Sequence, residues 1–109
     1  MVAETELDVR GSFETKKLMC GEMYKVSFLL KTQDCTIGKV NLELCLPDGS
    51  RLHYEAPLPT WTNEWEELEV GRFKMTEQNV GTMTFVMWQS FVKPAKGLII
   101  GGVVIKARA

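Results

Sequence analysis

The residues of this chain that could perform acid–base chemistry are a single histidine, His53, and a run of glutamates near residue 66. A general base needs a partner that orients it or shifts its pKa, and His53 stands alone in a stretch that reads as a strand. Glu67 and Glu69 would share one face of a strand, where like-charged neighbours in solvent need no catalytic role. No glycine-rich phosphate loop precedes a helix. The sequence therefore predicts no catalytic residues and no enzyme.

The cysteines, Cys20, Cys35 and Cys45, are odd in number and contain no Cys-x-x-Cys pair. No His, Cys and Asp residues have the spacing of a metal site, so we expect neither a metal nor a cofactor. There is no Asn-x-Ser/Thr glycosylation sequon. The N-terminal segment, residues 1–6, is acidic and polar, so it lacks the basic start and the apolar run of a secretory signal. These features favour a reducing, cytoplasmic location.

Three tryptophans, Trp61, Trp65 and Trp88, are the residues best suited to contact a ligand. Trp61 lies in a proline-bounded loop, and simple alternation turns Trp65 and Trp88 toward the polar faces of their strands. An exposed indole is a flat apolar plate with one N–H donor. It can stack on the apolar face of a sugar ring while polar side chains take the hydroxyls. The alternatives are a protein contact or, for Trp65 in particular, burial through a β-bulge.

The predicted sugar site combines aromatic plates with a few hydrogen-bonding groups, as small-ligand sites usually do. Trp61 and Trp88 would stack on sugar rings, and Trp65 is a further candidate. The full set of predicted site residues is Trp61, Trp65, Trp88, Phe91, Asn63, Glu64 and Gln89.

The elements that must position these residues are β-strands, because the dominant hydrophobic period is two. Apolar and polar residues alternate over 7–13, 24–31, 40–46, 51–55, 64–73, 82–88 and 98–106. Residues 47–50 read as a turn, residues 15–19 as one helical turn, and Gly101 with Gly102 as a bulge or a close backbone approach. Half-polar strands of this kind predict an all-β fold, an antiparallel β-sandwich of seven or eight strands in one domain, residues 1–109.

The charged residues leave a net charge of −1 and are unevenly distributed. No Lys or Arg lies between Leu52 and Gly71, a stretch with five glutamates, and after Glu77 all charged residues are basic. We interpret both stretches as solvated strand edges and turns, with complementary patches at a homodimer contact as the alternative. The balance argues against nucleic-acid binding, including that of an extended RNA strand. No apolar run approaches the ~20 residues of a membrane helix.

Six segments, in chain order, resemble the phloem protein 2 domain, the plant phloem lectin family that includes the Nictaba-related lectins. They are 7–18 (LDVRGSFETKKL), 21–26 (GEMYKV), 40–49 (VNLELCLPDG), 65–73 (WEELEVGRF), 81–85 (GTMTF) and 96–105 (KGLIIGGVVI). The resemblance covers about residues 6–106. It implies a jelly-roll-like sandwich that binds N-acetylglucosamine oligomers or N-glycan cores without chemistry. It also implies a nucleocytoplasmic or phloem-sap location and often a dimer.

Two parts of the family pattern differ in this sequence. Many members carry an upstream tryptophan-rich segment, which this chain begins too late to contain, so residues 1–109 could be the C-terminal part of a longer protein. Many also have a Gly-Gly-His-Trp-Lys-like loop, where residues 89–96 here place Pro94 about where the Trp stands. The expected function is a non-enzymatic lectin domain for an oligosaccharide or glycoprotein. The alternative is a protein-interaction or structural phloem-protein domain with the same fold and no sugar site.

Overall fold

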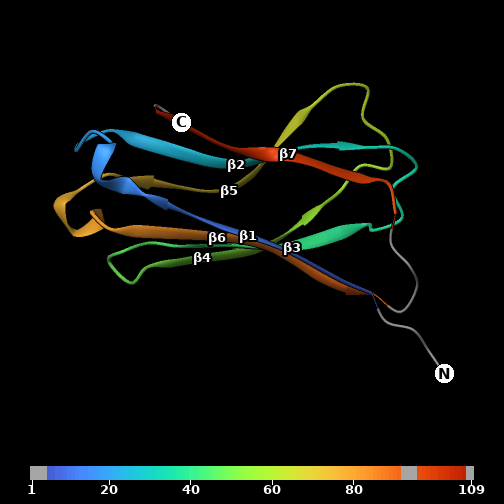
Figure 1. Cartoon of the computed structure of the whole chain (residues 1–109), viewed down its shortest axis with the longest axis horizontal. Coiled ribbons are helices and arrows are strands. Elements are labelled where there is room, and N and C mark those ends of the chain that lie inside the picture. Colours follow the sequence, from blue (N-terminus) through green and yellow to red (C-terminus); the bar gives the residue numbers. More distant parts are fainter. Residues whose placement is uncertain (1–4, 92–95, 108–109) are drawn as a thin grey trace.

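Seven strands make up most of the described chain, which in this computed structural model comprises residues 5–91 and 96–107. Their bounds are β1 (Thr5–Glu14), β2 (Met23–Thr32), β3 (Lys39–Cys45), β4 (Arg51–Pro57), β5 (Glu66–Lys74), β6 (Thr82–Phe91) and β7 (Leu98–Ala107). Two short 3-10 turns, η1 (Thr15–Lys17) and η2 (Glu77–Asn79), lie at the same end of the molecule (Figure 1). The helical turn expected at 15–19 corresponds to η1.

The strands form two antiparallel sheets that pack face to face (Figure 1). Sheet A has the strand order β1-β6-β3-β4, and sheet B has the order β5-β2-β7. Among the described strands, the β3–β4 hairpin is the one connection that stays within a sheet, whereas the other five cross to the opposite sheet. The predicted all-β, jelly-roll-like antiparallel sandwich is therefore confirmed.

The core between the sheets is built from the apolar stripes that the alternation predicted. On sheet B, the buried apolar side chains of β2 are Tyr24, Val26, Phe28 and Leu30, and Ser27 and Thr32 of the same strand are also buried. On sheet A, the buried stripes of β3 and β6 are Val40, Leu42, Leu44, Met83, Phe85 and Met87. The alternate side chains of these strands point away from the core, so each sheet keeps one outer face.

Gly101 and Gly102 lie at a β-bulge in β7. The register against β2 shifts at Gly101, which has no partner residue, while Gly102 pairs with Leu29. A Cβ atom built on Gly101 lies only 2.8 Å from Cζ3 of the Trp65 ring, so a side chain there would collide with the indole. The bulge and the close approach offered as alternatives from the sequence are thus both present.

Strand β5 departs from its predicted form in two respects. It begins at Glu66 rather than Glu64, because the preceding residues belong to the loop that follows β4. It also contains a bulge at Val70, which the sequence did not indicate, so that Val70 and Gly71 are both buried. Leu52 of β4 fills the space above Gly71, with Cδ1 2.9 Å from a Cβ built there.

Candidate functional site

All three tryptophans lie outside the core. Trp61 is 60% exposed in the loop between β4 and β5, and Trp65 is 44% exposed just before β5. Trp88 lies on the outer face of sheet A, where it is partly buried by its neighbours. The structure therefore keeps Trp65 outside the core instead of burying it through a bulge.

Trp88 is held by four strands from separate parts of the sequence. On β6, it lies between Asp8 of β1 and Asn41 of β3. Its ring stacks on His53 of β4, with ring centroids 5.2 Å apart and planes inclined by 19°. The Asn41 side-chain amide donates to the backbone oxygen of Trp88 at 3.4 Å. One face of the indole is thus supported by the imidazole.

A small pocket opens beside this indole. It has a volume of about 240 Å³ and is lined by Asp8, Arg10, Glu43, Val86 and Trp88. A second hollow of about 410 Å³ shares three of these residues and extends along β1 and β6 toward Ser12 and Thr84. The outer face of sheet A therefore places an aromatic wall, two carboxylates, a guanidinium and hydroxyl groups around adjoining hollows.

The charges in this pocket are paired. Arg10 donates from Nε and Nη2 to the two Asp8 carboxylate oxygens, at 2.9 and 2.8 Å. These hydrogen bonds lower the pKa of Asp8, so this carboxylate is ionised at neutral pH. Arg51 on β4 lies 3.9 Å from a Glu43 oxygen. Each carboxylate oxygen has more than one acceptor position, so both groups can still accept hydrogen bonds from a ligand.

The loop between β4 and β5 holds three of the predicted site residues together. Trp61, Asn63 and Glu64 are all exposed there. Two hydrogen bonds of 2.9 Å attach the loop to β2: the Thr62 N–H donates to the Thr32 backbone oxygen, and the Thr32 N–H donates to the Thr62 hydroxyl. Trp61 is therefore presented from an anchored loop.

The remaining predicted residues lie away from the Trp88 ring. Gln89 follows Trp88 on β6 and so points to the opposite face, where its amide Nε2 donates to the Lys39 backbone oxygen at 3.1 Å. Trp65 lies against sheet B, with the Lys31 Nζ atom 5.2 Å from its ring centroid. The backbone of Phe91 ends β6, and its side chain lies outside the described residues. The structure thus divides the described members of the predicted set among four places: the outer face of sheet A, the loop after β4, the opposite face of β6 and sheet B.

Four residues beside Trp88 were not among the predicted site residues. They are Asp8, Arg10, Glu43 and His53. Each occupies a polar position of an alternating strand, so the sequence does indicate that they face outward. It does not indicate that β6 lies between β1 and β3, and this strand order is what brings them together.

Almost the whole chain matches one known family, because the model for Phloem protein 2 covers residues 1–107. This chain belongs to the phloem protein 2 family. Among proteins of Arabidopsis thaliana, it is 33% identical to PHLOEM PROTEIN 2-LIKE A1 over 111 residues and 32% identical to PHLOEM PROTEIN 2-LIKE A2 over 114 residues. Each alignment covers 94% of this chain. The family that the six sequence segments indicated is therefore confirmed.

The phloem protein 2 relatives are longer than this chain. The alignments cover 44% of PHLOEM PROTEIN 2-LIKE A1 and 56% of PHLOEM PROTEIN 2-LIKE A2, so the chain spans about half the length of these relatives. In the loop where the sequence departs from the family pattern, residues 92–95, including Pro94, lie outside the described residues.

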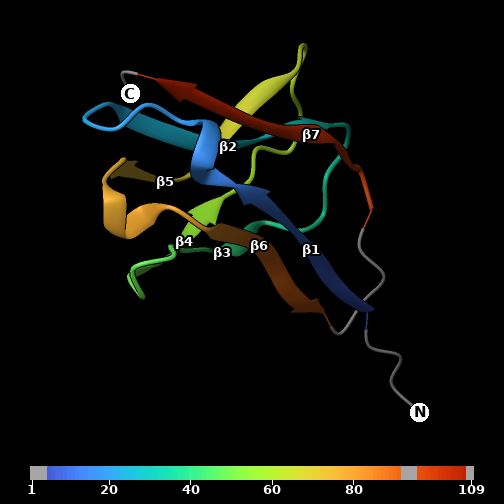
Figure 2. The ribbon, with the colours of Figure 1, turned by 60° about the vertical axis from the view of Figure 1, so that its left-hand side comes forward.

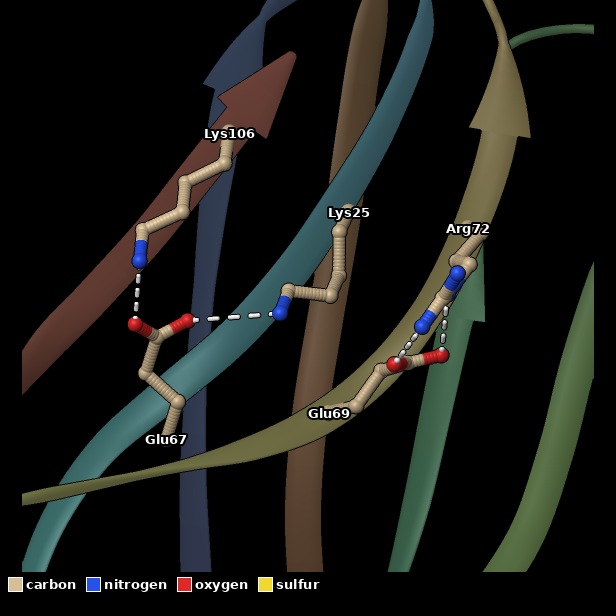
Figure 3. Close-up of polar contacts among 5 residues, drawn as sticks. All are labelled: Lys25, Glu67, Glu69, Arg72 and Lys106. Atoms are coloured by element: carbon tan, nitrogen blue, oxygen red, sulfur yellow. Dashed lines mark hydrogen bonds and ion pairs between the residues drawn. The ribbon is translucent and has the colours of Figure 1, made fainter. Parts of the chain in front are cut away.

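The outer face of sheet B in this phloem protein 2 domain carries paired charges (Figure 3). Glu67 accepts a hydrogen bond of 2.5 Å from Lys106 of β7 and lies 3.7 Å from Nζ of Lys25 of β2. The Lys106 hydrogen bond, aided by the charges of both lysines, lowers the pKa of Glu67. Glu69 accepts two bonds of 3.0 Å from Arg72. Part of the acidic stretch is therefore neutralised within the chain, in one case by a residue of the basic C-terminal stretch.

Within residues 5–91 and 96–107, no three His, Cys, Asp or Glu side chains are grouped so that they could hold a metal ion. Over the same ranges, no helix has the length and apolar character needed to cross a membrane.

Proposed function

We propose that this phloem protein 2 domain binds carbohydrate without catalysing a reaction, and that the outer face of sheet A is its binding surface. The observation that supports the proposal best is the pocket beside Trp88, where an indole wall meets Asp8, Arg10 and Glu43. An aromatic plate surrounded by fixed hydrogen-bonding groups matches a sugar ring, which has an apolar C–H face and a rim of hydroxyls. Membership of a family that includes phloem lectins supports the same function.

Each group in the pocket has a definite part in this binding mode. The free face of Trp88 packs against the sugar ring, while His53 supports the opposite face of the indole. The side chains of Asp8 and Glu43 accept hydrogen bonds from sugar hydroxyls, and Arg10 donates to a ring or acetamido oxygen. Sugar hydroxyls are strongly hydrated, so a hydroxyl that loses water must gain such a partner. We expect a single site to bind with a Kd of roughly millimolar to micromolar, about −4 to −8 kcal/mol.

The ligand class is an N-acetylglucosamine oligomer or the N-acetylglucosamine core of a glycoprotein, by resemblance to the phloem lectins. The hollow of about 410 Å³ that adjoins the Trp88 pocket gives room for further sugar units along β1 and β6. The contacts predicted from the sequence at Trp61, Asn63 and Glu64 form an alternative site, in the loop after β4 and outside this pocket. Such a domain would act in the cytoplasm, the nucleus or the phloem sap, and a homodimer would raise its avidity.

The proposal is tested with a glycan array, followed by calorimetric titration of the domain with chitotriose. We expect binding by the wild-type domain and a loss of at least about tenfold in affinity for Trp88→Ala. Trp61→Ala is the matched control, because it removes an equally large ring from an exposed loop outside the pocket. We expect this control to change the affinity by less than about twofold.

The outcomes separate the function from the site. A folded domain that binds no sugar on the array would refute the carbohydrate-binding function. Chitotriose binding that survives Trp88→Ala and disappears with Trp61→Ala would keep the function and move the site to the loop. Circular dichroism of each variant checks that the sandwich is intact.

A further inference from the structure

The two open sides of the sandwich are constructed differently. On one side, the edge strands β4 and β5 are joined: the Tyr54 hydroxyl donates to the Glu69 backbone oxygen, and Leu52 packs on Gly71. On the other side, the edge strands are β1 and β7, which lie opposite β4 and β5 in Figure 2. Each has one neighbouring strand, β6 for β1 and β2 for β7.

An apolar groove of about 430 Å³ lies between the sheets on the β1–β7 side. Its lining residues are Ser12, Phe13, Leu18, Phe85, Val103 and Ile105. Ser12 is the one polar member, and the others come from β1, β6, β7 and the residue that follows η1. A groove that is this apolar and open to solvent is typical of a surface that is covered by a binding partner.

The apolar surface continues along both edge strands. Most of the hydrophobic residues that are only partly buried against the core lie here: Leu7, Val9, Phe13, Leu18, Leu98, Ile100, Val103 and Ile105. Both strands are ten residues long, about 33 Å at ~3.3 Å per residue. The exposed apolar surface is therefore a long stripe, which fits an extended chain better than a compact small molecule.

We propose that this β1–β7 seam binds an extended segment of another protein chain by strand addition. An edge strand presents alternate N–H and C=O groups that no strand of its own sheet pairs with, and these can pair with an added strand. Every second side chain of the added segment would enter the groove between Phe13 and Val103. The partner segment should therefore alternate apolar and polar residues. This interaction is independent of the carbohydrate site on the outer face of sheet A.

Two exposed lysines at one end of the seam indicate that the partner segment is acidic there. Lys16 and Lys17 are exposed in η1, directly before Leu18, which lines the groove. Neither lysine pairs with an acidic residue within 5–91 or 96–107. A segment that follows the apolar stripe and carries acidic residues at this end would satisfy both features.

A second copy of this chain suits the seam less well. Its own edge strands could offer backbone hydrogen bonds, but their apolar side chains already point into their own core. They could not also fill a groove in a neighbouring molecule. A segment without a core of its own has side chains free to enter the space.

The test uses a short fluorescein-labelled peptide of alternating valine and threonine with two aspartates at one end, followed by fluorescence anisotropy. We expect saturable binding that weakens at least about fivefold in the double variant Lys16→Glu with Lys17→Glu. The control is Lys39→Glu with Lys74→Glu, on β3 and β5, which makes the same change in net charge on strands outside the seam and also removes the 3.0 Å ion pair of Lys39 with Glu55. Backbone amide hydrogen exchange should slow in β1 or β7 when the peptide is bound.

Several results would overturn the proposal. An all-threonine peptide of the same charge that binds equally well would show a purely electrostatic contact. Slower exchange confined to other strands would place the peptide elsewhere. Self-association through β1 or β7 without peptide binding would make the seam a homodimer contact. Chitotriose titration of the Lys16/Lys17 variant should be unchanged, so failure of the peptide experiment leaves the carbohydrate proposal standing.

Discussion

The substitution Gly11→Ala tests how closely Phe85 of β6 packs on Gly11 of β1, the neighbouring strand in sheet A. Gly11 lies directly opposite Phe85 in the β1–β6 pairing, and the Phe85 ring covers it. A Cβ built on Gly11 would be 2.6 Å from Cε2 of that ring, whereas carbon atoms pack best at about 3.5–4.0 Å. Phe28 meets this ring edge-on, with centroids 6.0 Å apart, and limits its movement on that side.

Two opposing terms set the sign of the effect. Replacing a strand glycine by alanine where there is room stabilises a protein by about 0.5–1 kcal/mol. Forcing an extra methyl group into a filled core destabilises it by about 1–3 kcal/mol. Because the contact at Gly11 is so short, we expect the second term to exceed the first. The free energy of unfolding should fall by about 0.5–2 kcal/mol, which lowers Tm by several degrees in a domain of this size.

Urea unfolding followed by circular dichroism measures this free energy, and Phe85→Leu supplies the control. In the Phe85→Leu background the ring edge is gone, so Gly11→Ala should become neutral or stabilising. A Gly11→Ala variant that is more stable than the wild type would refute the packing described here. Equal effects of Gly11→Ala in both backgrounds would show that Phe85 is not the cause.

Two further predictions concern sheet B. Gly101→Ala places a methyl group 2.8 Å from the Trp65 ring, but this ring is half-exposed and can move. We therefore expect a changed tryptophan emission, and a decrease of less than about 1 kcal/mol in the free energy of unfolding measured in urea. A larger decrease would mean that the indole is fixed. The lowered pKa of Glu67 means that its ionised form stabilises the folded state above the ordinary glutamate pKa, and this contribution is lost as the pH falls through the folded-state pKa. Lys106→Ala should therefore lower Tm at neutral pH, and its difference from the wild type should shrink on acidification. Melting curves at several pH values test this, with Lys74→Ala as the control; a pH-independent difference contradicts the ion pair.

The strands and most of the core could be predicted because the central strands β2, β3 and β6 bury apolar residues at every second position. The apolar residues of the stripes that contain Val26 and Leu42 recur at every second position, so both the sheet type and the inward apolar residues followed from local sequence. The same alternation correctly turned Trp88 outward. It also turns its neighbour Gln89 to the opposite face, away from the indole.

The surroundings of Trp88 could not be predicted because they depend on contacts between distant strands. Asp8 precedes Trp88 by 80 positions, yet the two residues are partners in the β1–β6 register. No local pattern shows that His53 of β4 will reach across β3 to stack on the indole. The ion pairs of Glu67 could not be predicted for the same reason, because Lys25 and Lys106 lie on strands that are distant in sequence.

The crossing connections have a consequence for how the molecule can be divided. Sheet A needs both β1 and β6, and sheet B needs both β2 and β7, so each layer is completed only by residues from near both ends of the described chain. A protease cut in any single loop between strands would leave two pieces, neither containing both complete sheets. We expect such pieces to remain interlocked while the domain is native and to fold poorly when made apart. Because so many of its contacts join remote segments, the intact domain should also fold slowly for its length.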